Sequence, residues 1–155
     1  NSITTKNEIK ELKKIPIREK FVKEMDDGEK LFTRIVGKDP LIGKLISKSL
    51  VIINKLKKHF NRPRPVVLAK KMGIELKDIK LKSMDSPAYP SGHATQATLL
   101  SLVLSDKYPE KKDKLKKLAR DIIHSRQVAH THYKSDNLMG EKLGKQMYNH
   151  IKNKI

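Results

Sequence analysis

The sequence predicts an all-α fold built as one domain, and three observations lead to that prediction. Val, Ile and Thr rarely alternate with polar residues, so β-strands find little support. Apolar residues instead recur at steps of three and four, which is the spacing of one helix face. Proline and helix-capping residues divide the chain into pieces of helical length. With 155 residues, 37% of them hydrophobic, the chain can bury one core but not a second independent one.

Each element follows from these signals. Asp39-Pro40 is a typical helix start, because proline is tolerated in the first turn. The stretch Ala97–Leu104 is apolar on nearly every side, which predicts a central buried helix. In the first part of the chain, a short amphipathic pattern within 6–26 stops near Pro16, a second pattern covers 29–36, and a long helix runs from Asp39-Pro40 to about His59. A non-helical turn at Asn61-Arg62-Pro63-Arg64-Pro65 follows, and then a short helix and a loop with Pro87 and Pro90 within 66–89. Three more helices are predicted over about Ser91–Lys107, Pro109–Val128 and Ser135–Lys152.

The chain is read as a single domain over 1–155, without an internal repeat or a low-complexity linker. Its chemistry-bearing motifs fall within a core of about 40–150, and 1–37 is read as an N-terminal helical segment. No stretch of 18 apolar residues is present, so no transmembrane segment is expected. No secretory signal pattern is visible either. The chain begins with Asn1 rather than Met, which leaves open a leader or membrane segment ahead of it, and the compartment stays open.

Composition narrows the class of partner. The formal net charge of +18 favours an anionic partner such as a phosphoester, a nucleic acid or an acidic membrane surface, although a solvated lysine-rich surface explains the charge equally well. The six arginines are more informative than the many lysines, because only Arg contacts phosphate through a planar fork. The absence of Cys excludes a disulfide framework and a thiolate metal site.

The first motif pairs a lysine with an arginine. Ile46, Leu50, Ile53 and Lys57 follow steps of four, three and four, which predicts that Lys57 lies on the buried stripe of the long helix. Arg64 sits in a stiff double-proline turn just after the end of that helix, so the two cations could face one anion. The alternative is a lysine that snorkels at a helix end.

The second motif is Pro90-Ser91-Gly92-His93 at a helix start. Exposed N–H groups and the helix dipole favour an anion there, and Gly92 allows it to approach the backbone closely. Taken alone, the motif is equally compatible with an ordinary Ser91 cap.

The third motif is Ser125-Arg126, followed by His132 and Asp136. Arg126 continues the apolar face of its helix, so it should point inward. His132 and Asp136 are four residues apart and lie side by side in a helical turn. A carboxylate on one ring nitrogen leaves the other free to attack. The alternative for His132 alone is a satisfied, partly buried histidine.

Together these motifs resemble the type 2 phosphatidic acid phosphatase superfamily, which includes class A bacterial acid phosphatases, lipid phosphate phosphatases and vanadium haloperoxidases. The family pattern is K-x6-R-P, then P-S-G-H, then S-R-x5-H-x3-D, and every specified position is present in order. The resemblance covers roughly 40–150. It implies a compact helical bundle of the acid phosphatase and haloperoxidase type, in agreement with the helical pattern.

The resemblance also implies roles for the matching residues. His132 is similar to the family's nucleophile, which becomes phosphohistidine, and Asp136 to its orienting partner. His93 is similar to the general acid that protonates the leaving oxygen and later activates water. The remaining matches resemble a metal-free phosphate cradle: Lys57, Arg64, Ser91, Gly92 and Arg126.

The expected activity is therefore hydrolysis of phosphate monoesters, with diphosphates and lipid phosphates as further candidates. The partner is a small anionic phosphoester, with no obligate nucleic acid. No cofactor or metal is expected, and vanadate should inhibit. Four histidines between 124 and 150 could suggest zinc, but His132 and Asp136 already have another explanation.

Two other functions stay open from the sequence. A basic helical nucleic-acid-binding protein would account for the charge, but not for His132 and Asp136, and aromatic residues for base stacking are few. A vanadium haloperoxidase would use the same cradle, but the chain is short for that group. One departure from the family pattern is His130, where relatives often have Gly; its side chain is expected either to narrow the pocket, to contact substrate or to point outward. His59, His124 and His150 are expected to be structural or surface residues. The substrate and the oligomeric state stay open.

Overall fold

The computed structural model describes residues 3–154, which form helices and connecting loops with no strand among them. The all-α prediction is confirmed. Residues 1, 2 and 155, which the single-domain prediction includes, lie outside the described residues. In chain order the helices are α1 (Ile3–Lys14), α2 (Glu19–Glu24), α3 (Gly28–Val36), α4 (Pro40–Phe60), α5 (Pro65–Lys71), the 3₁₀ turn Lys82–Asp85, α6 (Gly92–Lys107), the 3₁₀ turn Pro109–Lys111, α7 (Lys112–Val128) and α8 (Lys134–Ile151).

Helix boundaries follow the local signals in the sequence. Asp39 caps α4, where its Oδ1 accepts the Leu41 N–H at 2.9 Å, and Pro40 occupies the first turn. The same helix ends at Asn61, whose φ of 48° is left-handed, before Pro63 prevents any continuation. Ser91 caps α6 by accepting the Ala94 N–H at 3.2 Å. These ends place charged motif residues where helices stop or start.

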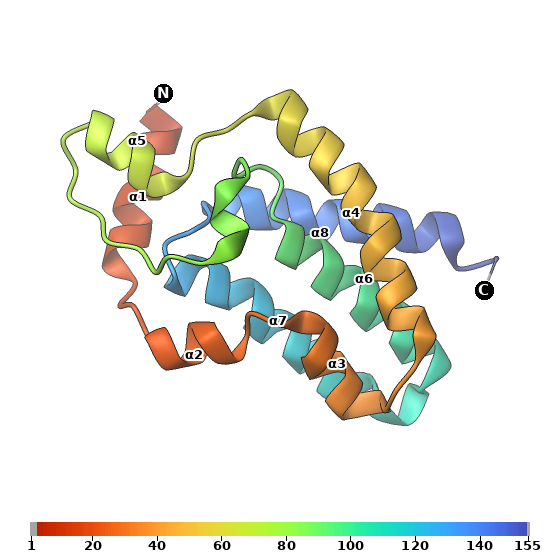
Figure 1. Ribbon diagram of the computed structural model, residues 1–155. Coiled ribbons are helices and arrows are strands. Elements are labelled where there is room, and N and C mark those ends of the chain that lie inside the picture. Colours follow the sequence, from red (N-terminus) through yellow and green to blue (C-terminus); the bar gives the residue numbers. More distant parts are fainter. Residues whose placement is uncertain (1–2, 155) are drawn as a thin grey trace.

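Helix α6 is the centre of the bundle and packs against α4, α7 and α8 (Figure 1). Its buried residues cover all sides of the helix, as predicted from Ala97–Leu104. The main core joins Leu100 and Leu104 of α6 to Phe32 of α3, Leu45 of α4 and Ile122 of α7. Burial of such apolar surface is the main source of stability.

The contact between α6 and α8 depends on two glycines. A Cβ on Gly140 would lie 2.7 Å from both the Ala94 Cβ and the Ser91 carbonyl oxygen. A Cβ on Gly144 would lie 2.7 Å from the Thr95 carbonyl oxygen. Both glycines are therefore close-packing positions, and the backbones of α6 and α8 approach each other along this line.

The buried face of α4 differs in one respect from the prediction. Lys57 is buried, as expected, but Leu50 is 45% exposed. The buried positions are Ile42, Leu45, Ser49, Ile53 and Lys57, so the stripe runs in steps of three and then four. Ser49 fits this narrow stripe beside α6, where its hydroxyl contacts the Gln96 amide at 3.3 Å, and Leu50 is turned away from the core.

Candidate active site

The three motifs converge where α6 and α8 begin. The Ser91 N–H donates to the Asp136 carbonyl oxygen at 3.1 Å and so joins the two helix starts. Lys57 comes from the last turn of α4, Arg64 from the residue before α5, and Arg126 from the last turn of α7. The structure brings all the predicted site residues into this region, and six of them are buried: Lys57, Arg64, Ser91, Arg126, His132 and Asp136.

The partners of the His132 ring fix its tautomer. Nδ1 lies 3.1 Å from Asp136 Oδ2, and Nε2 lies 3.0 Å from Arg64 Nη1. A guanidinium can only donate, so Nε2 must be the acceptor, and Nδ1 carries the proton that it donates to Asp136. His132 therefore presents the lone pair of Nε2 to a cationic region. A nucleophilic nitrogen needs such a lone pair.

Burial and nearby cations keep this ring neutral. Burial lowers the pKa of His132 well below its ordinary value, and Arg64, Lys57, His93 and Arg126 lower it further. The pKa is lowered rather than raised because a protonated imidazolium would be buried among other positive groups. The ring is thus neutral before any anion binds.

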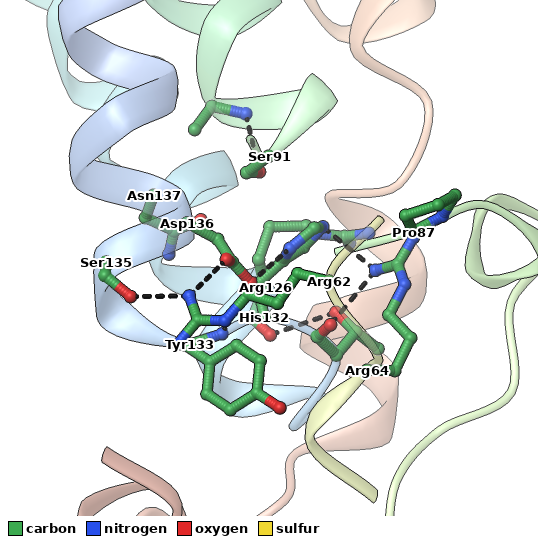
Figure 2. A network of polar contacts seen from close by, with 12 residues as sticks. Arg62, Arg64, Pro87, Ser91, Arg126, His132, Tyr133, Ser135, Asp136 and Asn137 are labelled. Carbon is green, nitrogen blue, oxygen red and sulfur yellow. Dashed lines mark hydrogen bonds and ion pairs between the residues drawn. The ribbon is translucent and has the colours of Figure 1, made fainter. Parts of the chain in front are cut away.

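Asp136 belongs to a polar network that the sequence did not reveal (Figure 2). Arg62 Nη1 lies 2.8 Å from Asp136 Oδ1, and the Tyr133 N–H donates to Oδ2 at 2.9 Å. Burial raises the pKa of Asp136, while Arg62, the Tyr133 N–H and Arg64 act against that rise. Because its contacts with Arg62, Tyr133 and His132 are all with donors, we assign the carboxylate form.

Arg62 is itself held on several sides. It donates to Ser135 Oγ at 2.7 Å and pairs with Glu8 Oε2 of α1 at 3.1 Å. Its guanidinium carbon lies 3.7 Å from the centre of the Tyr133 ring. The sequence could have pointed to Arg62, because Arg-Pro occurs twice in the 61–65 turn. For Glu8, 54 residues away from Arg62, no local signal existed.

Two of the predicted cradle residues, Arg64 and Lys57, are tied to loop carbonyl groups. Arg64 donates to the carbonyl oxygens of Ser86 at 2.9 Å and Thr131 at 3.0 Å. Lys57 Nζ donates to the Pro87 carbonyl oxygen at 2.7 Å. Burial, followed by Arg64, lowers the pKa of Lys57 to about 7. The loop before α6 therefore positions both cations beside the start of that helix.

The start of α6 supplies backbone donors to the same region. A Cβ added to Gly92 would lie 3.9 Å from Lys57 Cε, so the backbone of Gly92 runs close to the Lys57 side chain. The first N–H groups of a helix have no intrahelical partner, and the helix dipole favours an anion near them. Lysine and backbone donors therefore share one side of the site.

His93 and Arg126 meet a third residue that the sequence did not identify. Asp26, in the turn between α2 and α3, lies 3.3 Å from His93 Nε2 and 3.2 Å from Arg126 Nη1 through its Oδ1 atom. Beside His93 is a cavity of about 370 Å³ whose lining includes Asp26, Gln96 and Leu100. Of the predicted site residues, His93 borders this cavity, whereas His132 is buried.

Comparison with known proteins identifies the family. The chain matches the PAP2 superfamily over residues 41–147, which is more than half of its length. It belongs to the PAP2 superfamily. The predicted resemblance is thereby confirmed.

Two curated relatives and one solved structure are similar to this PAP2-superfamily chain. Over 88 residues it is 35% identical to a non-specific acid phosphatase of Salmonella typhi and 34% identical to one of Salmonella typhimurium strain LT2. Each match covers 57% of this chain, and the chain spans about a third of each relative, 35% of its length. A transmembrane PAP2-type phosphatidylglycerolphosphate phosphatase from Bacillus subtilis shares the fold, with a TM-score of 0.65 and 18% identity over 97% of this chain and 83% of that one.

Among residues 3–154 of the PAP2 chain, none of the helices is both long and apolar enough to cross a bilayer. Nor does the described part of the chain contain a group of three or more His, Asp or Glu residues placed to hold a metal ion.

His130 takes a role different from the three that were considered. Its ring is buried, with Nδ1 2.7 Å from the Lys77 carbonyl oxygen and Nε2 2.7 Å from the Ile15 carbonyl oxygen. The side chain thus joins the segment after α1 to the loop after α5. Its φ of 58° is left-handed, a conformation that favours glycine. His59, His124 and His150 are exposed, as predicted.

Proposed function

We propose that this chain is a metal-independent phosphatase that hydrolyses phosphate monoesters through a phosphohistidine on His132. The observation that carries the proposal is the His132 ring, with its Nε2 lone pair directed at Arg64 and its Nδ1–H at Asp136. Membership of the PAP2 superfamily and the acid phosphatase relatives support the same activity.

In the first step, Nε2 of His132 forms a bond to phosphorus while the bond from phosphorus to the leaving oxygen breaks. His93 gives a proton to that oxygen, so the alcohol departs neutral. The phosphorylated ring becomes cationic, and the Asp136 carboxylate stabilises it through Nδ1–H. Attack releases Arg64 Nη1 from the lone pair that it contacts in the free protein.

The cradle stabilises the charge that develops on the equatorial oxygens. Arg64 and Lys57 supply charged donors from one side, and Ser91 and the Gly92 N–H supply donors at the helix start. Arg126 is 1% exposed, and its Nη2 has no hydrogen-bond partner among residues 3–154. A buried guanidinium nitrogen in that state is a suitable donor to a phosphoryl oxygen. These donors perform the work that a metal ion performs in other phosphatases.

In the second step, His93 takes a proton from water as the water oxygen attacks phosphorus. The bond from phosphorus to Nε2 breaks, inorganic phosphate leaves, and the proton taken by His93 restores the acid form for the next cycle. No oxidant, reductant or metal enters either step.

The substrate class follows from what the cradle can recognise. Only the terminal phosphoryl group needs to fit the donors, and the cavity beside His93 leaves room for leaving groups of different shape. Small phosphate monoesters are therefore the expected substrates. Diphosphates and lipid phosphates carry the same terminal group and belong in the test panel.

The test combines a substrate panel with identification of the labelled residue. Wild-type protein should hydrolyse monoesters equally well with and without EDTA, and vanadate should inhibit more strongly than phosphate because it mimics the transition state. Rapid quenching with labelled substrate should place an acid-labile label on His132. His132→Ala should abolish turnover, whereas His59→Ala, at an exposed position outside the motifs, should not.

Two results would contradict the proposal: metal-dependent activity lost in EDTA and restored by Zn²⁺ or Mg²⁺, or label on a residue other than His132. Salt-sensitive duplex binding by both wild type and His132→Ala, without turnover of any phosphoester by the wild type, would favour the nucleic-acid alternative instead.

A further inference from the structure

Asp26 connects two of the predicted site residues, His93 and Arg126. Its Oδ1 lies 3.2 Å from Arg126 Nη1 and 3.3 Å from His93 Nε2, and its carbonyl oxygen lies 2.9 Å from the same His93 nitrogen. The three residues come from the α2–α3 turn, the start of α6 and the end of α7. Asp26 is 100 residues from Arg126 and lies outside the 41–147 family match.

The fold fixes the position of this turn. Val22, one turn before Asp26, is fully buried against Val128 and Ala129 at the end of α7. Phe32, after the turn, is fully buried in the main core. Asp27 caps α3 by accepting the Lys30 N–H at 3.1 Å. Anchors on both sides therefore hold the Asp26 backbone above α7.

Asp26 accounts for the arrangement of the Arg126 guanidinium. Arg126 Nε donates to Ser125 Oγ at 3.1 Å, and Nη1 pairs with Asp26. With two of its nitrogens held in this way, the planar group can rotate little, and Nη2 is the nitrogen that has no partner among the described residues. The ion pair thus decides which edge of Arg126 is available to an anion.

Asp26 also determines which nitrogen of the His93 ring carries a proton. Both oxygens near Nε2 are acceptors, so Nε2 carries a proton. The hydrogen bond from His93 is the largest cause that lowers the pKa of Asp26, so Asp26 is a carboxylate. Nδ1 is then the nitrogen left to exchange a proton with the leaving group.

We infer that Asp26 is a positioning residue of this site, which orients the His93 ring through its Nε2–H and aims Arg126 Nη2 at the phosphoryl group. This inference rests on the proposed phosphatase function. The carboxylate acts through His93 and Arg126 rather than on the substrate. The opposite possibility is that Asp26 occupies the anion site and hinders binding.

Leaving groups of different quality separate these two possibilities. Asp26→Asn keeps the shape of the side chain and removes its charge. We expect the rate of phosphohistidine formation, measured by rapid quench, to fall roughly 30-fold on an alkyl phosphate, whose leaving oxygen needs a proton, and only about twofold on p-nitrophenyl phosphate. The KM should change little. Asp26→Glu should recover part of the rate that Asp26→Ala loses. Asp113→Asn, at an exposed position in the first turn of α7, is the matched control and should behave as wild type.

Binding of orthovanadate, measured by calorimetry, tests the same inference without turnover. Asp26→Ala should bind it several-fold more weakly, because Arg126 loses the partner that aims it, and thermal melting should show that the variant is folded. Tighter vanadate binding, a higher kcat/KM, or an equal loss in the rate of phosphohistidine formation from both substrates would overturn the inference. If the wild type hydrolysed no monoester, the proposed function would fail, and the vanadate comparison would still decide the role of Asp26.

Discussion

His132 is held at both ring nitrogens inside a buried network, whereas His93 is held at one nitrogen by a turn at the surface. The His132 side chain is 4% exposed and that of His93 is 21% exposed. Behind His132, Asp136 is joined to Arg62, and Arg62 to Glu8 of α1. Behind His93, the Asp26 side chain is 39% exposed and pairs with Arg126, and a cavity opens beside His93 and Asp26.

The difference between the two environments corresponds to the step that each histidine would perform in the proposed reaction. Attack on phosphorus is the same for every monoester, so a fixed nucleophile suits it. Protonation of the leaving oxygen depends on the leaving group, so an acid beside an open cavity suits many substrates. Changes behind His132 should therefore reduce the rate on all substrates equally, and changes around His93 should act selectively.

The largest effect is expected for Asp136→Asn. An amide can donate to Nδ1, which would move the ring proton to Nε2 and remove the attacking lone pair. We expect kcat to fall by about 10⁴-fold, by the same factor on alkyl and aryl phosphates. Steady-state kinetics on both classes checks this, with the exposed Asp113→Asn as control. A loss that depends on the leaving group would contradict the proposed difference between the surroundings of His132 and those of His93.

His93→Ala should have the next largest effect and should be selective. Without an acid, the rate of phosphohistidine formation should fall roughly 10²-fold or more on alkyl phosphates and far less on p-nitrophenyl phosphate, whereas hydrolysis of the phosphohistidine should slow equally for both. Formation of phosphohistidine from p-nitrophenyl phosphate, followed by rapid quench, should persist. An equal loss in the rate of phosphohistidine formation from both substrates would place His93 outside proton transfer to the leaving group.

Arg62→Lys tests the buried network behind His132. A lysine retains the charge near Asp136 but cannot contact Glu8, Ser135 and Asp136 with one planar group. A small displacement of His132 should then reduce kcat roughly tenfold on every monoester. Kinetics on the same pair of substrates measures this, and Arg34→Lys, at an exposed position, is the control. Unchanged kcat would show that the Arg62 network does not orient the nucleophile.

The smallest effect is expected for Lys57, as a change in anion binding with pH. Its pKa of about 7 means that the ammonium is present below that pH and is lost as the pH rises through it. Inhibition by sulfate, whose charge is constant over this range, should weaken roughly fivefold from about pH 6 to about pH 9. Lys57→Arg stays charged and should flatten this dependence. A slope that is equal in both proteins would assign the titration to another group.

Local signals in the sequence were sufficient for most helix boundaries and for the motif residues. Asp39-Pro40, the 61–65 turn and Ser91 act on their own neighbourhood, so their effect could be read without the fold. The step of four between His132 and Asp136 needs only one helical turn. Lys57 was placed correctly, but Leu50 was not, because the width of the buried stripe depends on how closely α4 approaches α6.

The partners of the site residues could not be predicted. Glu8 and Asp26 lie in the N-terminal segment, 54 and 100 residues from the arginines that they contact. Nothing in their neighbouring sequence distinguishes them from other surface acids, and only the packing of α1 and α2 brings them to the site. His130 was noticed as an exception, but its left-handed φ and its two carbonyl contacts become visible only in three dimensions.

The glycine contact between α6 and α8 restricts how this chain can adapt to new substrates by single mutations. Even alanine at Gly140 would press on Ala94 and on the Ser91 carbonyl group, which belongs to the cap that starts α6. Because α8 begins with the segment that carries Asp136, such a change would move both ends of the site at once. Adaptive substitutions are therefore expected in the α2–α3 turn and in the loop between α5 and α6. There, a side chain can change shape without shifting the pair of helices on which every substrate depends.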